Sequence, residues 1–368
     1  MTPPPLSPLV VDALGVRVGI DPSGLTPTDR DTVARVWADA RVVDPAPAEV
    51  VVAPVSSDRD GQTLSDLSGR VTQAAIDARR GELWMLHAAG LAASDGGVVV
   101  LVGPSGAGKT TATRLLARSW GYVSDETVGI ESDGGVRGYR KPLSVITEGK
   151  GYKIQHAPRD LGLRPLPTAP LRVRRVVLLD RDRAHARARL VPVPASDALV
   201  LLAPHSSALA SMPRPLGVVM SSLARTGGAL RAEYSEAEQL VDLVGDLMVE
   251  DLDRRPEPDE ASSAAVVSTP PSGASHGGGR RYRRGAVVDS CPLPDGRLAV
   301  MTGETDGRGT LRILAGVAPA ILRAADDATR DDLLRAATDG TPDDEAARAV
   351  DGILDQLVEA GLLTVTSG

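Results

Sequence analysis

Phenylalanine and asparagine are both absent from this chain of 368 residues, and aromatic residues make up only 2% of it. Hydrophobic residues still account for 42%, so the cores must be packed from Val, Leu, Ile and Ala rather than from rings. With so few rings, a surface on which nucleic-acid bases stack is not expected.

Cysteine occurs once, at Cys291, which excludes an internal disulfide framework and a cysteine-rich zinc site. This usage fits a reducing cytosol. Residues 1–8 are rich in proline and contain no basic segment followed by an apolar one, so we expect no signal peptide and a cytoplasmic location. No stretch approaches the roughly 20 apolar residues of a membrane span, and no membrane partner is expected.

The charge balance also limits the partners. The formal net charge is −7 and the pI is about 5.4, whereas sequence-independent binding of nucleic acid needs a surplus of Lys and Arg on one face. The local exception is a run of arginines, Arg280, Arg281, Arg283 and Arg284. We therefore expect no nucleic-acid partner.

The length predicts two ordered units joined by a linker. Residues 253–280 concentrate Pro, Ser, Ala, Gly and charge, which is typical of a flexible linker. The predicted parts are a small β-rich lead-in (1–66), a large α/β domain (67–252), the linker (253–280) and a small α+β domain (281–368).

Apolar periodicity places the main elements. In the lead-in it predicts strands over 10–20 and 49–55 and a helix over 28–38. In the large domain it predicts strands over 83–92, 98–102, 122–124 and 173–179, helices over 67–80, 110–120, 216–225 and 237–247, and a hairpin near 133–135.

A complete G-x-x-x-x-G-K-[ST] motif follows the all-apolar strand 98–102 and opens a helix. Its glycines let successive backbone N–H groups surround an anion, and the helix adds the positive end of its dipole. Lys109 is expected to bridge the β- and γ-phosphates, and Thr110 to offer its hydroxyl to Mg²⁺. The predicted ATP-binding residues are Gly103, Pro104, Ser105, Gly106, Ala107, Gly108, Lys109, Thr110 and Thr111.

Lysine is rare in this chain, and all four lysines fall within one short region: Lys109, Lys141, Lys150 and Lys153. A compact, mobile ammonium suits a tight phosphate site, whereas Arg suits flat bidentate recognition. For Lys141 a role toward phosphate or acceptor and a surface salt bridge are both open. For Lys150 and Lys153 a solvated surface position is favoured.

Two adjacent carboxylates, Asp125 and Glu126, follow the short strand after the motif helix. In phosphoryl transfer to a hydroxyl, one carboxylate accepts the proton while another acid holds the metal. An LSGGQ-like stretch downstream of the loop is missing, which disfavours a transporter-type ATPase. The absence of Asn excludes the N-K-x-D guanine reader of GTPases.

Three segments occur here in the order and spacing of HPr kinase/phosphorylase: residues 86–90 (Leu-His-Ala-Ala-Gly), the loop at 103–110, and residues 123–126 (Val-Ser-Asp-Glu). Residues 139–144 (Tyr-Arg-Lys-Pro-Leu-Ser) further resemble HPr-kinase-related proteins found beside genes for ribosomal peptide biosynthesis. The resemblance covers about residues 67–247 and implies a P-loop nucleotide-binding domain like those of HPr kinase and PEP carboxykinase.

By position, the resemblance makes His87 the active-site histidine, Asp125 the general base and Glu126 the metal-side carboxylate. The catalytic set is therefore His87, Lys109, Asp125 and Lys141, and the metal set is Thr110 and Glu126. The family usually has Asp where this chain has Glu126. Residues 136–139 (Val-Arg-Gly-Tyr) lack the R-G-x-G-I-like signature of the bifunctional enzyme, so reverse dephosphorylation is not carried over.

The last part of the chain predicts a hairpin, 285–290 with 297–301, a third strand over 310–314, and helices over 318–325, 330–337 and 346–360. Thr329 and Thr341 are expected as helix N-caps and Gly361 as a helix stop. This pattern resembles the PqqD-like domain, a winged-helix relative that holds the leader of a precursor peptide. DNA binding and an unspecific protein contact are alternatives, and the Asp-rich stretch 326–355 opposes the first.

These observations predict an ATP- and Mg²⁺-dependent kinase that phosphorylates a Ser or Thr hydroxyl of a precursor peptide or small protein. A regulatory ATP-binding protein and a small-molecule kinase are the alternatives. The sequence leaves open the acceptor, a homo-oligomer, and the base of the nucleotide beyond the missing guanine motif.

Overall fold

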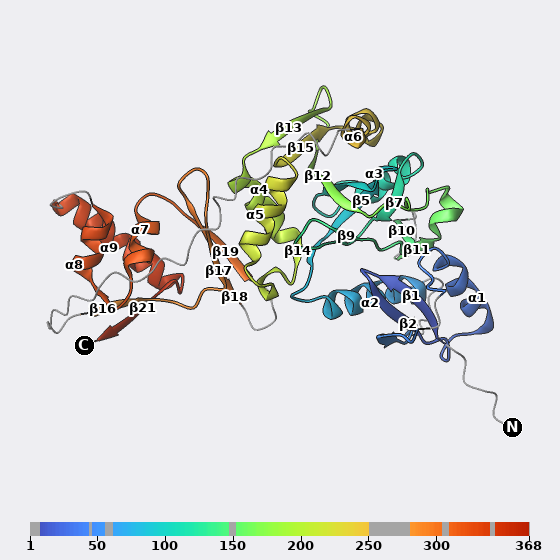
Figure 1. Cartoon of the computed structure of the whole chain (residues 1–368), viewed down its shortest axis with the longest axis horizontal. Helices are drawn as coiled ribbons and strands as arrows, with labels where there is room; N and C mark the ends of the chain where they lie inside the picture. Colours follow the sequence, from blue (N-terminus) through green and yellow to red (C-terminus); the bar gives the residue numbers. More distant parts are fainter. Residues whose placement is uncertain are drawn as a thin grey trace. The chain divides into compact units, whose positions relative to one another are not determined.

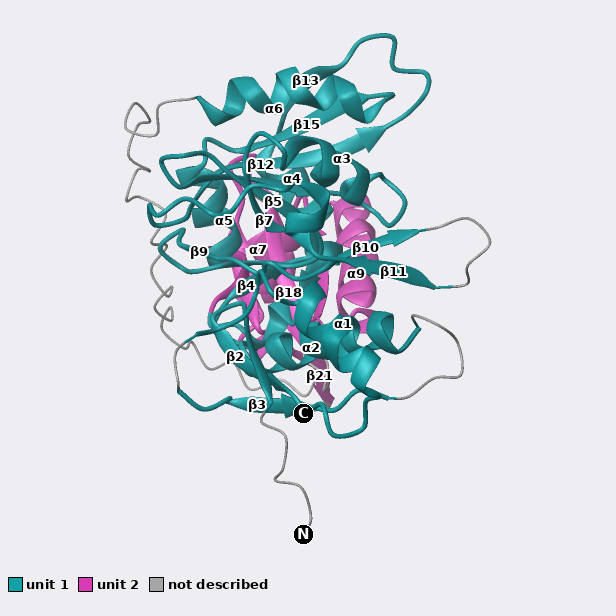
Figure 2. Ribbon diagram, turned by 90° about the vertical axis from the view of Figure 1, so that its right-hand side faces the viewer, with its two compact units in different colours: residues 1–213, 218–256 teal, residues 214–217, 257–368 magenta. Residues whose placement is uncertain are grey.

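The computed structural model describes residues 8–43, 46–55, 62–146, 152–249, 280–303, 309–338 and 343–367. The chain divides into two compact units, and each is considered by itself (Figures 1 and 2). Unit 1 comprises residues 1–213 and 218–256, and unit 2 comprises residues 214–217 and 257–368. The predicted boundaries stay predictions, because the linker lies outside the described residues apart from Arg280.

Unit 1 begins with a three-stranded sheet of order β1-β2-β3, formed by Leu9–Ala13, Val16–Ile20 and Val50–Val52. Helix α1 (Pro27–Val36) starts at the N-cap Thr26, whose side chain accepts from the backbone N–H of Asp29. Helix α2 (Gln62–Ala78) packs its apolar face onto this sheet, and both share one core with Tyr139.

The central sheet of unit 1 has six strands in the order β13-β15-β12-β6-β5-β7. Their bounds are β5 Ala88–Ala92, β6 Gly97–Val102, β7 Gly121–Ser124, β12 Arg172–Arg181, β13 Arg189–Val193 and β15 Ala229–Tyr234. Strand β12 runs parallel to both β6 and β15, and the other pairs are antiparallel.

Helices α3 (Lys109–Leu116) and α6 (Leu240–Met248) pack on this sheet through a core that contains Leu101, Leu116 and Leu247. The other helices are α4 (Ala195–Leu202) and α5 (Pro215–Arg225), with short 3₁₀ turns η1 (Pro158–Leu161), η2 (Ala203–His205), η3 (Leu209–Ser211) and η4 (Ala237–Gln239).

Two smaller sheets complete unit 1. One has the order β14-β4-β8-β9 and is formed by Ser206–Ser207, Trp84–Leu86, Val128–Ile130 and Val136–Arg137. The other is a hairpin of β10 (Leu143–Ile146) and β11 (Lys153–His156), in which Ile146 lies opposite Lys153.

Unit 2 holds two three-stranded sheets, β20-β16-β21 and β17-β18-β19. The strands are β16 Arg280–Arg284, β17 Asp289–Pro292, β18 Leu298–Gly303, β19 Gly309–Leu314, β20 Ala328–Thr329 and β21 Leu363–Ser367. Helices α7 (Ala318–Ala324), α8 (Arg330–Ala337) and α9 (Asp344–Glu359) share an apolar core with these strands.

Most expected elements are present within a few residues of their predicted bounds, and Thr329 caps α8 as expected. The single strand expected over 10–20 is instead a hairpin of β1 and β2, because the chain turns at Leu14 and Gly15, both of which have positive φ angles. The expected strand 83–92 is instead two strands, β4 and β5, which belong to different sheets and are separated at His87. The strand expected over 285–290 begins only at Asp289. Thr341 lies outside the described residues, and α9 is capped by Asp343.

Within the described ranges, none of the helices combines the length and the apolar character that a membrane crossing requires.

Candidate functional site

The candidate site forms where several strands of the six-stranded sheet end at one edge. Strands β6, β12 and β15 are parallel, so residues 103–108, Arg181 and Tyr234 come out at the same side. Strand β7 is antiparallel to β5, which is itself antiparallel to β6, so Asp125 also follows a strand that ends there. His87 precedes β5 and joins them at this edge.

The loop at 103–110, which is expected to bind phosphate and is called the phosphate loop below, has a backbone that requires glycine. Gly106 and Gly108 have φ angles of 86° and 87°, in the left-handed region that other residues rarely adopt. Helix α3 begins directly afterwards at Lys109. The Lys109 Nζ atom donates to the carbonyl oxygens of Gly103 at 2.6 Å and Pro104 at 3.1 Å, so the ammonium is folded back over the loop. This arrangement suits an anion at the helix N-terminus.

The loop is attached to the far side of the parallel sheet by one side chain. Tyr234, the last residue of β15, donates its hydroxyl hydrogen to the carbonyl oxygen of Ala107 at 2.8 Å. Arg181, at the end of β12, donates to Glu236 at 2.9 Å and lies close to Gly108. The loop is thus supported by a hydrogen bond from β15, and a side chain from the end of β12 lies beside it.

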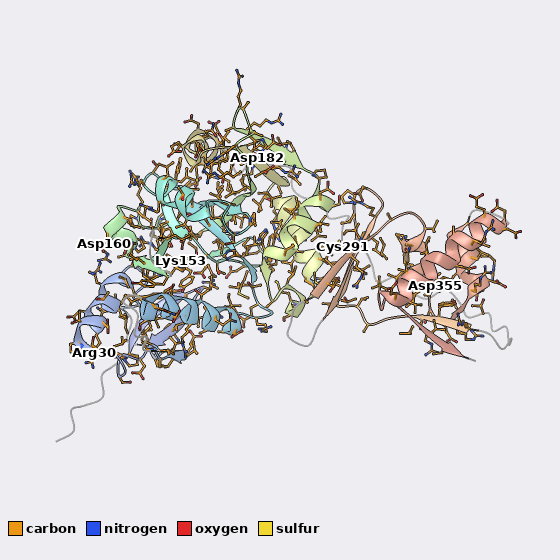
Figure 3. The ribbon with its side chains drawn as sticks, turned by 180° about the vertical axis from the view of Figure 1, so that it is seen from behind. Arg30, Lys153, Asp160, Asp182, Cys291 and Asp355 are labelled. Carbon is orange, nitrogen blue, oxygen red and sulfur yellow. The ribbon has the colours of Figure 1, made fainter. Side chains whose placement is uncertain are left out.

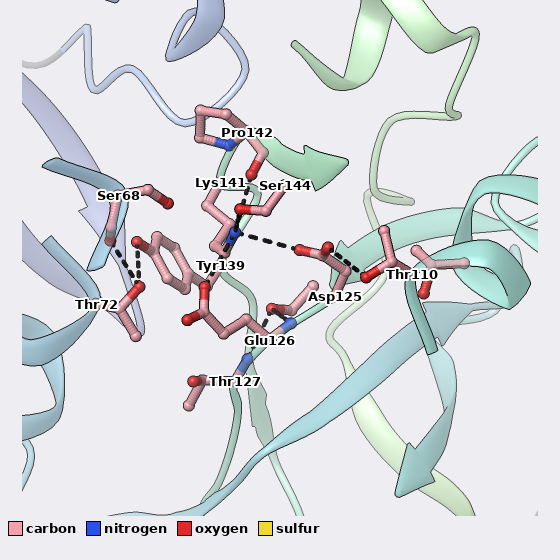
Figure 4. A network of polar contacts seen from close by, with 12 residues as sticks. Ser68, Thr72, Thr110, Asp125, Glu126, Thr127, Tyr139, Lys141, Pro142 and Ser144 are labelled. Atoms are coloured by element: carbon pink, nitrogen blue, oxygen red, sulfur yellow. Dashed lines mark hydrogen bonds and ion pairs between the residues drawn. The ribbon is translucent and has the colours of Figure 1, made fainter. Parts of the chain in front are cut away.

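Asp125 is buried, and its two carboxylate oxygens have different partners (Figure 4). Oδ1 accepts a hydrogen bond from the Tyr122 hydroxyl at 3.0 Å and lies 3.4 Å from Lys141 Nζ. Oδ2 lies 3.5 Å from the Thr110 hydroxyl of the loop helix. One oxygen is therefore fixed from within the protein, while the other is directed to the phosphate loop.

Lys141 is a buried cation held between the two acids, with a relative exposure of 1%. Its Nζ lies 3.0 Å from Glu126 Oε2 and donates to the Pro142 carbonyl at 2.9 Å and to Ser144 Oγ at 3.3 Å (Figure 4). Burial lowers the pKa of Lys141, but the charges of Asp125 and Glu126 outweigh it and hold the pKa above its usual value. Lys141 is therefore charged at neutral pH.

The oxygen donors around the cleft fit magnesium, which prefers hydroxyl and carboxylate oxygens together with water and phosphate. Thr110 and Glu126 are the predicted ligands, and the Glu126 side chain is 31% exposed. No group of three or more His, Cys, Asp or Glu side chains suited to a metal occurs in the described part of the chain. A magnesium ion here would take its other ligands from phosphate and water.

His87 lies at the break between β4 and β5. Its backbone N–H donates to the His205 carbonyl at 2.7 Å, and the next residue, Ala88, donates to the Glu126 carbonyl at 3.1 Å. Burial lowers the pKa of His87, and the charge of Lys109 lowers it further, so the ring is neutral at pH 7. A neutral imidazole beside the phosphate loop can accept or donate one hydrogen bond.

These residues line one cleft in unit 1 with a volume of about 360 Å³. Its walls are the loop, α3, the residues around Asp125, and the β10–β11 hairpin. The lining residues are His87, Ser105, Gly106, Gly108, Lys109, Thr110, Thr111, Arg114, Asp125, Glu126, Lys141, Ser144, Val145, Ile146, Lys153 and Arg181. The predicted catalytic and metal residues all border this cleft, and Gly103, Pro104 and Ala107 complete the loop beside it.

Some of the surrounding residues were not expected from sequence. Tyr122 and Tyr234 look like ordinary core residues of strands, and only the sheet pairing shows that their hydroxyls meet Asp125 and the loop. Lys153, which is labelled in Figure 3, is exposed, as expected. It nevertheless borders the cleft. Lys150 lies outside the described residues.

No protein-family model matches the chain, and no curated protein matches it. Among solved structures, the chain is similar to the Hpr(Ser) kinase/phosphatase from Coxiella burnetii, with 14% identity and a TM-score of 0.24. The similarity covers 44% of this chain and 92% of that chain. A TM-score at this level does not define the fold, so the site is assigned from the geometry of its residues alone.

Replacing Lys141 with Met should destabilise unit 1 by about 3–5 kcal/mol, because the change leaves the buried Asp125 carboxylate without its cation. Urea unfolding at neutral pH measures this. Lys153→Met is the matched control, since it removes an exposed lysine and should change stability by no more than about 0.5 kcal/mol. Equal stability of the two variants would show that the buried ion pair is not formed.

The imidazole of His87 should titrate below its ordinary pKa of 6.5 in the nucleotide-free protein. Since the unfolded chain then binds more protons, the contribution of His87 to stability is complete above pH 6.5 and is lost as the pH falls below it. An NMR titration, with the resonance assigned through His87→Gln, gives the midpoint. A midpoint above 6.5 would contradict the position of His87 beside the charge of Lys109.

Proposed function

We propose that this protein is an ATP-dependent kinase that transfers the γ-phosphoryl group to a hydroxyl, of Ser or Thr, on a peptide or small protein. The observation that carries the proposal is the position of Asp125, whose Oδ2 lies 3.5 Å from Thr110 of the phosphate loop while Oδ1 is fixed by Tyr122. A carboxylate held beside the expected γ-phosphate position is suited to accept the proton of an attacking hydroxyl.

The other residues of the cleft have complementary parts in this proposal. The loop and Lys109 would bind the β- and γ-phosphates, and Lys141 and Tyr122 would hold Asp125 in position. Mg²⁺ bound near Thr110 and Glu126 would neutralise charge that develops on the phosphates. His87, neutral at pH 7, would hydrogen bond to the transferred group or to the acceptor.

We further propose that unit 2 is PqqD-like and recruits the acceptor through a leader segment. In support, β19 is an edge strand in the sheet β17-β18-β19, and an apolar groove of about 430 Å³ runs beside it. Its lining includes Ile313, Leu314, Ala318, Ile353 and Leu357. An extended peptide can add to such an edge and place alternate side chains in the groove.

Replacing Asp125 with Asn should leave ATP affinity within about tenfold of the wild type, roughly 1.4 kcal/mol, because the loop is unchanged. Phosphoryl transfer should fall by about 10²-fold or more, as on loss of a general base. Calorimetry and transfer of label from [γ-³²P]ATP measure the two effects. Lys109→Ala is the reference variant and should abolish ATP binding. Full transfer by the Asn variant would overturn the base assignment.

A chain that ends at residue 252 should keep its ATP affinity, since the loop, Asp125 and Glu126 all lie in unit 1. Its KM for a leader-bearing peptide should rise while the rate at saturation changes little, because a tethered recognition module raises local substrate concentration. The isolated residues 279–368 should bind the leader and restore little activity when added back. An unaltered KM would remove the leader-binding role from unit 2.

A further inference from the structure

The cleft contains more positive charge than the nucleotide site explains. Lys109 belongs to the phosphate loop, Lys141 is neutralised by Asp125 and Glu126, and Arg181 is paired with Glu236. Two further cations border the same cleft, Arg114 and Lys153. Neither forms an ion pair with another residue in the part of the chain that the structure describes.

Arg114 lies on α3 four residues after Thr110, so both side chains are on the same face of the helix. This spacing places Arg114 about 6 Å further along the helix axis, away from the N-terminus that faces the phosphates. The pKa of His156 in β11 is lowered mainly by burial, and the charge of Arg114 lowers it further. The charge of Asp160 raises the pKa of His156, but Asp160 already forms an ion pair with Arg35 at 2.6 Å.

Lys153 borders the cleft from the wall formed by the β10–β11 hairpin. It lies on β11, opposite Ile146 of β10, and both residues line the cleft. The pKa of Lys109 is lowered mainly by burial, and the charge of Lys153 lowers it further, so the two ammonium groups lie near each other. Arg114 and Lys153 therefore stand on two walls of the cleft, next to the phosphate loop.

We propose that Arg114 and Lys153 form an anion-binding subsite for the acceptor, which therefore carries a carboxylate or a phosphate close to the hydroxyl that is phosphorylated. This inference rests on the proposed kinase function. It assigns the substrate class: a hydroxyl-bearing peptide with an acidic group beside the Ser or Thr.

One observation favours the acceptor over the nucleotide as the ligand of this subsite, and a second explains why an acidic acceptor needs further cations in the cleft. The loop amides, the helix N-terminus and Lys109 already provide for the triphosphate, and Arg114 is one helical turn beyond them. The acceptor must also approach two carboxylates, Asp125 and Glu126, that share a single buried cation. An acidic acceptor would be repelled there unless further positive charge offset that excess.

The test is calorimetric titration of the full chain, saturated with Mg²⁺ and a non-hydrolysable ATP analogue. The probes are three blocked peptides that differ only in the residue after Ser: Asp, phosphothreonine or Asn. The Asp or the phosphothreonine peptide should bind at least about tenfold more tightly than the Asn peptide, as expected for a charge-assisted contact. The tighter of the two identifies carboxylate or phosphate as the source of the anion.

Arg114→Gln and Lys153→Gln should each remove most of this preference and leave the affinity for the ATP analogue unchanged. Arg118 is an exposed arginine just after the end of α3 and does not line the cleft, so Arg118→Gln is the matched control and should keep the preference. The subsite is overturned if the wild type binds the three peptides equally or not at all, or if the preference survives both substitutions.

A loss of ATP-analogue affinity of more than about tenfold in both variants would assign the cations to the triphosphate and also overturn the subsite. Failure of the kinase function has a different signature. In that case the wild type prefers the acidic peptides and the two variants lose this preference, but no label passes from [γ-³²P]ATP to any of the three peptides.

Discussion

The site depends on one buried charge, the ammonium of Lys141. Two carboxylates that are adjacent in sequence repel each other, and Asp125 is removed from water, so this pair would be costly without a cation between them. Lys141 provides it at 3.4 Å and 3.0 Å, and the same ammonium group also donates to the Pro142 carbonyl and to Ser144 Oγ. Its position also links the parts of unit 1, because Tyr139, two residues earlier, packs in the core of the N-terminal sheet and lies 3.1 Å from Thr72.

Around this ion pair, the direction of the strands arranges the other groups. Parallel strands end at a common edge, so a loop after β6, an arginine at the end of β12 and a tyrosine at the end of β15 are brought together although they are far apart in sequence. The chain therefore brings together a glycine-rich loop from one segment, a buried carboxylate from a second and the loop's support from a third. The β10–β11 hairpin then forms the remaining wall and brings Lys153 to it.

The sequence predicted the parts of this site that are local. The phosphate loop, the helix after it, and the acidic pair after β7 follow from motif and periodicity, because each depends on residues within a few positions. It could not predict Tyr234 as a site residue, since its contact with the loop comes from pairing between distant segments. Tyr122 and Arg114 lie close in sequence to Asp125 and Thr110, but no motif distinguishes them from ordinary strand and helix residues. The Arg-rich strand β16 was not predicted because its charged residues resemble the end of a linker. Strands β10, β11 and β13 were not predicted because they are short and partly polar.

The strand order of the central sheet also bears on how the chain folds. Strand β6 pairs with β12, and β12 with β15, across long intervening segments. The chain must therefore lose the conformational entropy of closing these long loops before the strand pairs can stabilise it. The hydrogen bond from Tyr234 to Ala107 joins residues 127 positions apart and needs both pairings in place. The loop sequence can be synthesised early, but the supported phosphate loop is completed only when β15 has joined the sheet. The supported conformation of residues 103–108 is therefore a late product of folding that requires closure of the whole sheet.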